Sequence, residues 1–193
     1  MIELRGKKVV LRVMEREDCR RLWEEAEPLQ PLAEQSVTPG LSVEGADKWF
    51  EEIQSKQGKG QFYLGIFSLK GELLGDIQIA NIDWRHRTAT IGCGISRARH
   101  RGKGYATDAT LTILRFAFEQ LDLYRISADT AEYNTAARRV LEKCGFIQEG
   151  CCRQAIFCGG KRHDRIISGL LRPEFEKSKR STNPSNRRRT RRG

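Results

Sequence analysis

One segment of this chain, residues 91–109, constrains its fold more than any other. Its sequence, IGCGISRARHRGKGYATDA, is typical of a β-strand followed by a glycine-rich loop and the start of a helix. Gly102 and Gly104 let the backbone turn without Cβ clashes, so that successive N–H groups can converge on an anion. A helix that begins near Gly104 adds its free N-terminal N–H groups and its dipole. The segment therefore predicts a site for a phosphate-bearing ligand.

The bare pattern R-x-x-G-x-G, here Arg99 to Gly104, is a weak signal, because an ordinary basic turn before a helix has the same form. The order of the surrounding elements favours the phosphate interpretation. An apolar strand precedes the loop, an amphipathic helix follows it, and four basic side chains surround it: Arg97, Arg99, Arg101 and Lys103.

The 193 residues suffice for one domain with a sizeable core, and their charge is unevenly distributed. Residues 15–52 hold eleven acids and four bases, whereas residues 177–193 hold eight basic and no acidic residues. We expect residues 1–176 to form the folded domain and residues 177–193 to form a disordered basic tail. The tail is either a tolerated, solubilising extension or a weak contact to RNA or the ribosome.

The sequence predicts a cytoplasmic protein with no membrane contact. Its longest stretch without Asp, Glu, Lys or Arg is ten residues, Gly60 to Leu69, and the N-terminus lacks the apolar run of a signal peptide. Its cysteines form no C-x-x-C pair, which favours small buried apolar residues over a metal site. They are Cys19, Cys93, Cys144, Cys151, Cys152 and Cys158.

Hydrophobic periodicity predicts the remaining elements. The expected strands are 9–13, 61–69, 73–84, 87–95, 124–130, 146–157 and 163–171; the expected helices are 17–26, 42–57, 105–120 and 134–144. Ser42 is expected to cap the second helix, and Gly145 to end the fourth. This order predicts an α/β fold with a mixed sheet packed against helices.

Two ordered motifs in the chain resemble the GNAT acetyltransferase superfamily. The first is Ile91–Ile95 followed by the loop and Tyr105-Ala-Thr, and the second is NTAARRVLEKCGF at residues 134–146. Leu11-Arg12, Glu17-Asp18 and the closing Gly169-Leu-Leu resemble the branch that acetylates the N-termini of ribosomal proteins. The similarity covers about residues 7–175.

The resemblance implies a GNAT-type fold: a mixed, mostly antiparallel sheet with helices on both faces and a splayed central strand pair. It implies acetyl-CoA as co-substrate and no metal. The backbones of Cys93 and Ile95 would pair with the pantetheine arm, and Gly92 and Gly94 suit a bulge there. Asn134 would be the family's pantetheine-side Asn, a helix N-cap, or both. The pyrophosphate would be cradled by Arg101, Gly102, Lys103, Gly104, Tyr105 and Ala106.

The reaction that the resemblance implies is attack of a neutral amine on a thioester, which requires groups that move protons. The positions of the family's usual Tyr, Ser and Glu are occupied here by Leu141, Ala137 and Ile156, all apolar. Some polar residues near strand ends could substitute, although each is more often a solvated or capping residue: Asp83, Asp129, Glu132 and His163. His86 and His100 are expected to be exposed. No catalytic residue is assigned from the sequence.

The sequence thus predicts an N-acetyltransferase that acts on a primary amine. This amine belongs either to a protein N-terminus of the ribosomal type or to a cationic small molecule. The acidic residues 15–52 either attract a cationic acceptor or are only the solvated faces of two surface helices. The alternative is a catalytically inactive acyl-CoA-binding module that contacts RNA or the ribosome through the tail. Either form is expected to be a monomer or a homodimer.

Overall fold

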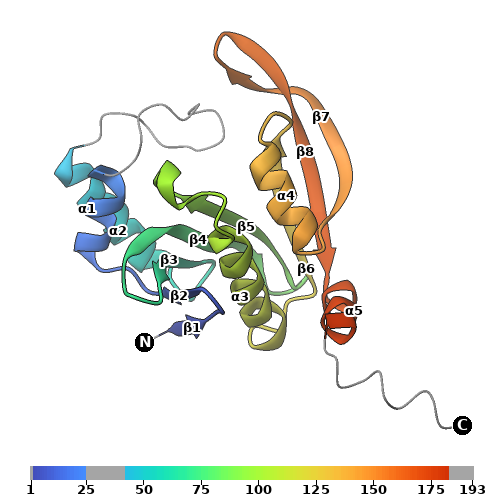
Figure 1. Ribbon diagram of the computed structural model, residues 1–193, viewed down its shortest axis with the longest axis horizontal. Helices are drawn as coiled ribbons and strands as arrows, with labels where there is room; N and C mark the ends of the chain where they lie inside the picture. Colours follow the sequence, from blue (N-terminus) through green and yellow to red (C-terminus); the bar gives the residue numbers. More distant parts are fainter. Residues whose placement is uncertain (1, 25–41, 183–193) are drawn as a thin grey trace, which may run out of the picture.

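One sheet organises the computed structural model, which describes residues 2–24 and 42–182 (Figure 1). Its eight strands have the order β1-β2-β3-β4-β5-β6-β8-β7. All neighbours are antiparallel except β5 and β6, which run parallel. The strands are β1 (Glu3–Arg5), β2 (Val9–Arg12), β3 (Phe62–Ser68), β4 (Leu73–Asp83), β5 (Thr88–Ile95), β6 (Arg125–Ala131), β7 (Ile147–Cys158) and β8 (Lys161–Leu171).

Helices cover both faces of the sheet, as expected. They are α1 (Arg16–Glu24), α2 (Val43–Lys56), α3 (Tyr105–Glu119), α4 (Thr135–Lys143) and α5 (Arg172–Thr182), with a short 3₁₀ turn at Ala98–His100. On one face, α1 and α2 bury Cys19, Leu22 and Ile53 against Phe67 and Leu73 of the sheet. The opposite face holds the larger core, which includes residues of α3, α4 and α5. The predicted mixed, mostly antiparallel sheet with helices on both faces is confirmed.

Strand alternation explains which side chains reach each core. Leu64 and Ile66 of β3 and Ile77 and Ile79 of β4 are fully buried in the α3 core, because every second residue of a strand points to the same face. Ser42 caps α2, as predicted, by accepting a hydrogen bond from the Gly45 N–H (3.3 Å). Gly145 has φ +91°, as expected of a residue that ends a helix.

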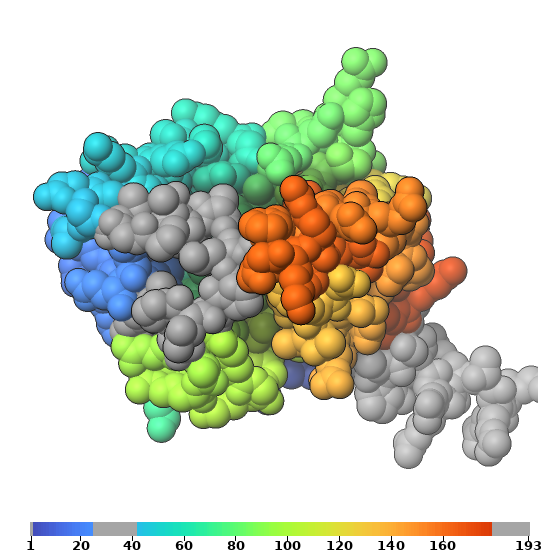
Figure 2. Space-filling model, turned by 90° about the horizontal axis from the view of Figure 1, so that it is seen from above, coloured from blue at the N-terminus to red at the C-terminus, as the bar shows by residue number. Residues whose placement is uncertain are grey.

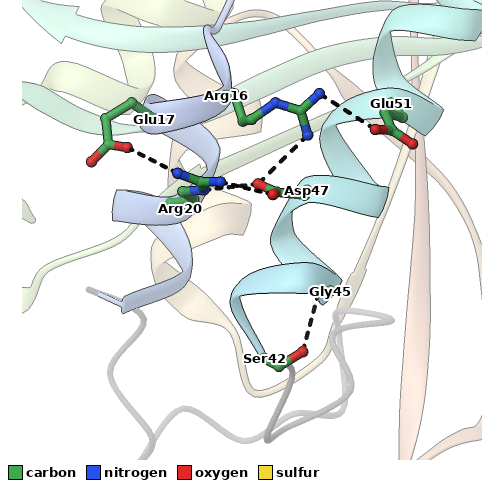
Figure 3. Close-up of polar contacts among 7 residues, drawn as sticks. All are labelled: Arg16, Glu17, Arg20, Ser42, Gly45, Asp47 and Glu51. Carbon is green, nitrogen blue, oxygen red and sulfur yellow. Dashed lines mark hydrogen bonds and ion pairs between the residues drawn. The ribbon is translucent and has the colours of Figure 1, made fainter.

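Ion pairs fasten α1 to α2 (Figure 3). The Arg20 guanidinium donates two hydrogen bonds of 2.8 Å to the carboxylate of Asp47. Arg16 lies 3.6 Å from Asp47 and 3.4 Å from Glu51. Part of the acidic surplus of residues 15–52 is therefore engaged between these two helices.

The structure contains two elements that the sequence analysis did not predict, β1 and α5. Helix α5 is anchored by Phe175, which is buried with its ring centroid 5.2 Å from that of Phe118. The helix continues to Thr182 and so includes the first residues of the expected tail. Residues 183–193, and the expected end of the first helix at residues 25–26, lie outside the described residues.

A bulge at Gly92 and Gly94 was expected, and this expectation is wrong. The β4–β5 register is continuous from Gly75 opposite Ile95 to Ala80 opposite Thr90, and the irregularity lies between Ala80 and Asp83. Glycine is needed here for another reason. A Cβ on Gly75 would lie 2.0 Å from the carbonyl oxygen of Gly94, so the two backbones approach more closely than side chains allow.

Burial of the cysteines was predicted correctly for Cys19 and Cys144 but not for Cys93, Cys151 and Cys152, which are exposed. Cys151 and Cys152 lie on β7, the edge strand, where side chains have few neighbours. All six cysteines are free thiols. Among the described residues, no helix is both long and apolar enough to cross a membrane.

Candidate active site

The two parallel strands at the centre of the sheet separate after a short contact. Strand β5 pairs with β6 at Thr88, Ala89 and Thr90, and the ladder between the described strands ends there. Beyond it, residues 91–95 of β5 stay in register with β4, and no described strand pairs with them on the β6 side, although the Ile95 carbonyl accepts a hydrogen bond from Arg101 (3.3 Å). This confirms the predicted splay. The unpaired backbone groups of β5 can bind an extended molecule as an added strand would be bound.

Cys93 and Ile95, the predicted pantetheine contacts, lie on the unpaired part of β5. Cys93 is opposite Ile77, so its side chain points to the α3 face. Gly92 and Gly94 alternate with it, so a side chain at either position would point to the α1–α2 face. The backbones of Cys93 and Ile95 are therefore placed at the edge of the splay, where the prediction requires them.

The loop after β5 has the conformation expected of an anion site. Gly102 (φ +73°) and Gly104 (φ +83°) are both left-handed, which favours glycine, and α3 begins at the next residue, Tyr105. Because Gly104 is the N-cap and has no side chain, it does not cap the first N–H groups of α3. The backbone N–H groups of Gly102 to Ala106 thus belong to one short segment, formed by the end of the loop after β5 and the first turn of α3.

Arg101 has a structural role in this loop. Its guanidinium donates to the carbonyl oxygens of Ile95 (3.3 Å) and Ser96 (3.2 Å), and its backbone N–H donates to that of Ala98 (3.0 Å). Arg101 therefore holds the loop against the end of β5. The pyrophosphate cradle over residues 101–106 stays a prediction, in which the backbone N–H of Arg101 is already engaged by Ala98.

Two further residues of the loop are engaged with Glu72. The Arg99 guanidinium lies 3.0 Å from its carboxylate, and His100 Nε2 lies 3.3 Å from the same oxygen. His100 is 6% exposed, so its predicted exposure is wrong, whereas His86 is exposed as expected. His100 is the last residue of the 3₁₀ turn, and its Nε2 also accepts a hydrogen bond from Arg99 Nε (3.0 Å).

A cation from the far end of the sequence reaches the loop. Lys8 Nζ donates to the carbonyl oxygen of Lys103 (2.8 Å) and lies 3.1 Å from the place of a Cβ on Gly104. The turn that carries Lys8 is fixed because the Asp108 carboxylate, in the first turn of α3, accepts hydrogen bonds from the N–H groups of Lys7, Lys8 and Val9. No local motif could reveal this lysine, which is separated from the loop by 95 residues.

Asn134 is the N-cap of α4. Its Oδ1 accepts a hydrogen bond from the N–H of Ala137 (3.0 Å), and it follows β6 directly at the open side of the splay. The capping role is confirmed, and a contact with the pantetheine arm stays a prediction.

The positions of the family's usual proton carriers are apolar in the structure too. Ile156 is buried at 5% exposure, and Leu141 packs against the main core. Ala137 is half-buried at the start of α4. None of the three side chains can exchange a proton, so the chemistry needs other groups.

The four substitutes noted from the sequence have structural partners. Asp83 accepts a hydrogen bond from the N–H of His86 (2.9 Å), and Asp129 pairs with Arg165 (3.5 Å). Glu132 and His163 come together, with 3.3 Å between Glu132 Oε1 and His163 Nδ1, although Glu132 also accepts from the Asp164 N–H. These contacts give each residue a structural role at a strand end.

Sequence reasoning missed a carboxyl group on the α1–α2 face, that of Asp76 in β4. Asp76 lies between the buried Leu74 and Ile77 and directly opposite Gly94 of β5. Its Oδ2 accepts a hydrogen bond from the Tyr63 hydroxyl (2.8 Å). Burial raises the pKa of Asp76, while the Tyr63 hydrogen bond lowers it. An Asp in the interior of a strand, among buried apolar residues, is unusual, and that signal could have drawn attention to it.

The loop and the tip of the β7–β8 hairpin lie at the same end of the molecule. Figure 2, which views this end, shows the yellow-green residues around the loop on one side and the orange hairpin tip on the other. The C-terminal ends of the parallel strands β5 and β6 also point toward this end, where α4 begins after β6. The predicted cofactor residues are thus gathered at one end of the sheet.

The comparison with protein families agrees with this geometry. Residues 8–147 match the family model described as the acetyltransferase (GNAT) domain. The chain belongs to the GNAT acetyltransferase family. This is a family of acyltransferases.

Three curated relatives of this GNAT chain have informative names. One is YdaF of Bacillus subtilis (strain 168), provisionally named a ribosomal N-acetyltransferase, 37% identical over 56% of this chain and 59% of that protein. Another is spermidine N(1)-acetyltransferase of Vibrio cholerae, 32% identical over 53% of this chain and 59% of that protein. The [ribosomal protein uS5]-alanine N-acetyltransferase of Escherichia coli (strain K12) is 25% identical over 62% of each chain. Each alignment spans less than two thirds of the relative's length.

Solved structures show the same fold over nearly the whole chain. A crystal structure of a probable acetyltransferase is 28% identical, has a TM-score of 0.81, and is matched over 90% of this chain and 99% of its own. The fold predicted from two sequence motifs therefore extends over nearly all of the described residues.

Proposed function

We propose that this GNAT enzyme transfers the acetyl group of acetyl-CoA to a primary amine on a cationic acceptor. The observation that carries the proposal is the splay between β5 and β6, which ends at a left-handed glycine loop. In this proposal the backbones of Cys93 and Ile95 bind the pantetheine arm, and Asn134 lies beside it. The N–H groups of Gly102, Lys103, Gly104, Tyr105 and Ala106 bind the pyrophosphate.

The charged side chains around the loop divide into two groups in this proposal. Arg99 and Arg101 are held by Glu72 and by backbone carbonyls, so they shape the loop. The ammonium of Lys8 contacts a carbonyl oxygen rather than a carboxylate, and its charge therefore remains available to a phosphate. Acetyl-CoA supplies the activated acyl group, and the protein supplies binding and orientation.

The α1–α2 face supports a cationic acceptor. A row of aromatic rings crosses this face, with 5.6 Å between the centroids of Trp23 and Trp49 and 5.6 Å between those of Trp49 and Tyr63. The row ends at Asp76, which Tyr63 contacts through its hydroxyl. Aromatic faces next to a carboxylate attract ammonium groups. The surplus of acids in residues 15–52 acts in the same direction, although Arg16 and Arg20 engage part of it.

The names of the relatives are consistent with two kinds of cationic acceptor, spermidine-like polyamines and ribosomal-protein N-termini. We favour a protein N-terminus because the opening and closing segments resemble that branch. The proposed location is the cytoplasm, a reducing compartment that suits six free thiols. We also propose that the protein is a monomer or homodimer and that residues 1–176 form its catalytic domain. The tail would make a weak contact with RNA or the ribosome.

A competition assay tests this function. The protein is incubated with acetyl-CoA and equal concentrations of cationic, neutral and acidic primary amines, and CoA thiol release is followed with mass analysis of the products. We expect kcat/KM for the cationic amines, spermidine and a basic Ala-initiated peptide, to exceed that of neutral ones by about tenfold at low salt. The advantage should shrink toward about 1 M salt, where the screening length is about 3 Å.

Preference for a neutral or acidic amine that salt does not change would contradict the cationic acceptor. Binding of CoA without any acetylated product would contradict transfer itself and favour the inactive acyl-CoA-binding module. The control is the same assay with the protein heat-inactivated, which measures spontaneous thiol release.

A further inference from the structure

We infer that Asp76 receives the ammonium group of the acceptor and acts as its general base, with Tyr63 as the residue that positions the Asp76 carboxylate. This inference rests on the proposed acetyl transfer and names the residue that the apolar positions Leu141, Ala137 and Ile156 leave unassigned. It follows from the place of Asp76 in the sheet, from its partner, and from the surroundings of its carboxyl group.

Asp76 lies beside the proposed cofactor path. Its register partner is Gly94, which lies between Cys93 and Ile95. This part of β5 is paired with β4 but not with β6. Because Gly94 has no side chain, nothing from that residue separates the Asp76 side of the sheet from the β5 backbone. Ile77 faces the α3 core, so Asp76 faces the opposite side, where α1 and α2 pack. An acceptor that enters from the α1–α2 face meets Asp76 next to the thioester.

The surroundings of Asp76 suit a proton acceptor. Protein atoms desolvate its carboxyl group and raise its pKa, which brings it closer to the pH at which a base is effective. Asp76 as a whole residue is half-buried rather than fully buried. Tyr63 donates one hydrogen bond to Oδ2 and thereby fixes the orientation of the carboxylate.

The titratable groups affected by the charge of Asp76 are Tyr63 on β3, Cys19 on α1 and Cys93 on β5. Desolvation raises the pKa of Cys19 and of Cys93 to about 12 and that of Tyr63 well above 10, although Cys93 keeps an exposed edge. All three are neutral at pH 7. Asp18 of α1 and Asp47 of α2 also lie near Cys19, ion-paired with Arg12 (3.3 Å) and Arg20 (2.8 Å), so an acid-range titration is assigned to Asp76 by its loss in the Asp76→Asn variant.

The proposed step balances as follows. Asp76 takes one proton from the acceptor ammonium, and the neutral amine forms a bond to the thioester carbonyl carbon. The C–S bond then breaks, and the CoA thiolate takes the second proton that the new amide nitrogen loses. Asp76 finally releases its proton to solvent, so the net products are the N-acetylated amine, CoA thiol and one proton.

The test uses Asp76→Asn in the full chain, with Asp83→Asn on the same strand as its control. For Asp76→Asn we expect kcat/KM to fall by about 100-fold or more, CoA affinity to stay within about twofold, and the acid limb of the pH profile to disappear. The control variant should keep the rate and the acid limb of the parent. Asp76→Glu should restore part of the rate.

Stability and Tyr63 provide two further readouts. A carboxyl group whose pKa is raised by folding destabilises the native state as pH rises above its unfolded value near 4, so Asp76→Asn should not lower Tm at pH 7. Because the Tyr63 hydrogen bond lowers the Asp76 pKa, Tyr63→Phe should move the acid limb to higher pH.

Failure of this inference differs from failure of the proposed function. A parent protein that releases no thiol with any amine contradicts the function. A parent that is active, together with an Asp76→Asn variant that keeps its rate and its acid limb, overturns the role of Asp76. An Asp76→Asn variant with low activity and an equally low Tm at pH 7 also overturns it, because a structural role would then suffice.

Discussion

Replacement of Gly102 by Glu weakens CoA binding by roughly 100-fold or more while the protein remains folded. A carboxylate at this position meets the cofactor pyrophosphate, and like charges brought together in a binding site cost several kcal/mol. The fold tolerates the change because a Cβ on Gly102 has no neighbour within 4 Å among the described residues. The φ of +73° adds a strain of about 1–2 kcal/mol. Calorimetric titration with CoA measures the loss.

Gly58→Glu is the matched control for this prediction. Gly58 has φ +76°, and among the described residues a Cβ there has no neighbour within 4 Å either. Gly58 lies just before β3, near Gly60, whose carbonyl accepts a hydrogen bond from the Ile82 N–H. Ile95 is opposite Gly75, at the other end of β4, so Gly58 is distant from the glycine loop. The control carries the same strain and charge, so it should lose similar stability but bind CoA normally. Equal affinities for both variants would show that the loop is only a turn.

Gly75→Ala destabilises the protein by about 3 kcal/mol and lowers Tm by roughly 6–12 °C. The added methyl group would lie 2.0 Å from the Gly94 carbonyl oxygen and 3.0 Å from Cα of Ile95, both backbone atoms that cannot rotate away. Strand β5 must therefore shift relative to β4, at the residues that we propose bind the pantetheine arm. Thermal unfolding followed by circular dichroism gives the effect.

The control is Gly60→Ala, since Gly60 lacks a positive φ and any Cβ neighbour within 4 Å in the described part of the chain. We expect its Tm to stay within about 2 °C of the parent value. A Gly75→Ala variant that melts as the parent does would show that β4 and β5 are not packed as closely as the structure has them.

The fold was largely predictable because its elements carry strong local signals. The apolar strand before the glycine loop and the amphipathic helix after it predicted β5 and α3, and Ser42 predicted the cap of α2. Helix α5 was not predicted, because tertiary contacts hold it, among them the packing of Phe175 on Phe118 and the ion pair of Arg172 with Asp122. The tail composition from Lys177 onward concealed the helix that extends into it.

The candidate site was less predictable, because its parts come from distant segments. The loop glycines and Asn134 could be found from motifs, but Lys8 reaches the loop only through the turn that Asp108 fixes. Asp76 gains its properties from Tyr63 and from the register opposite Gly94, neither of which a local pattern shows. The bulge expected at Gly92 and Gly94 was wrong for the same reason, since the need for glycine arises across the strand pair.

A crystal structure of this protein with CoA tests the central claim most directly. We predict that the pantetheine arm lies between β5 and β6 and bonds to the backbones of Cys93 and Ile95, with the pyrophosphate at the N–H groups of Gly102 to Ala106. The CoA sulfur should then be reachable from the Asp76 side of the sheet. A CoA molecule bound outside the splay, with the β5 edge left unpaired, would contradict the account.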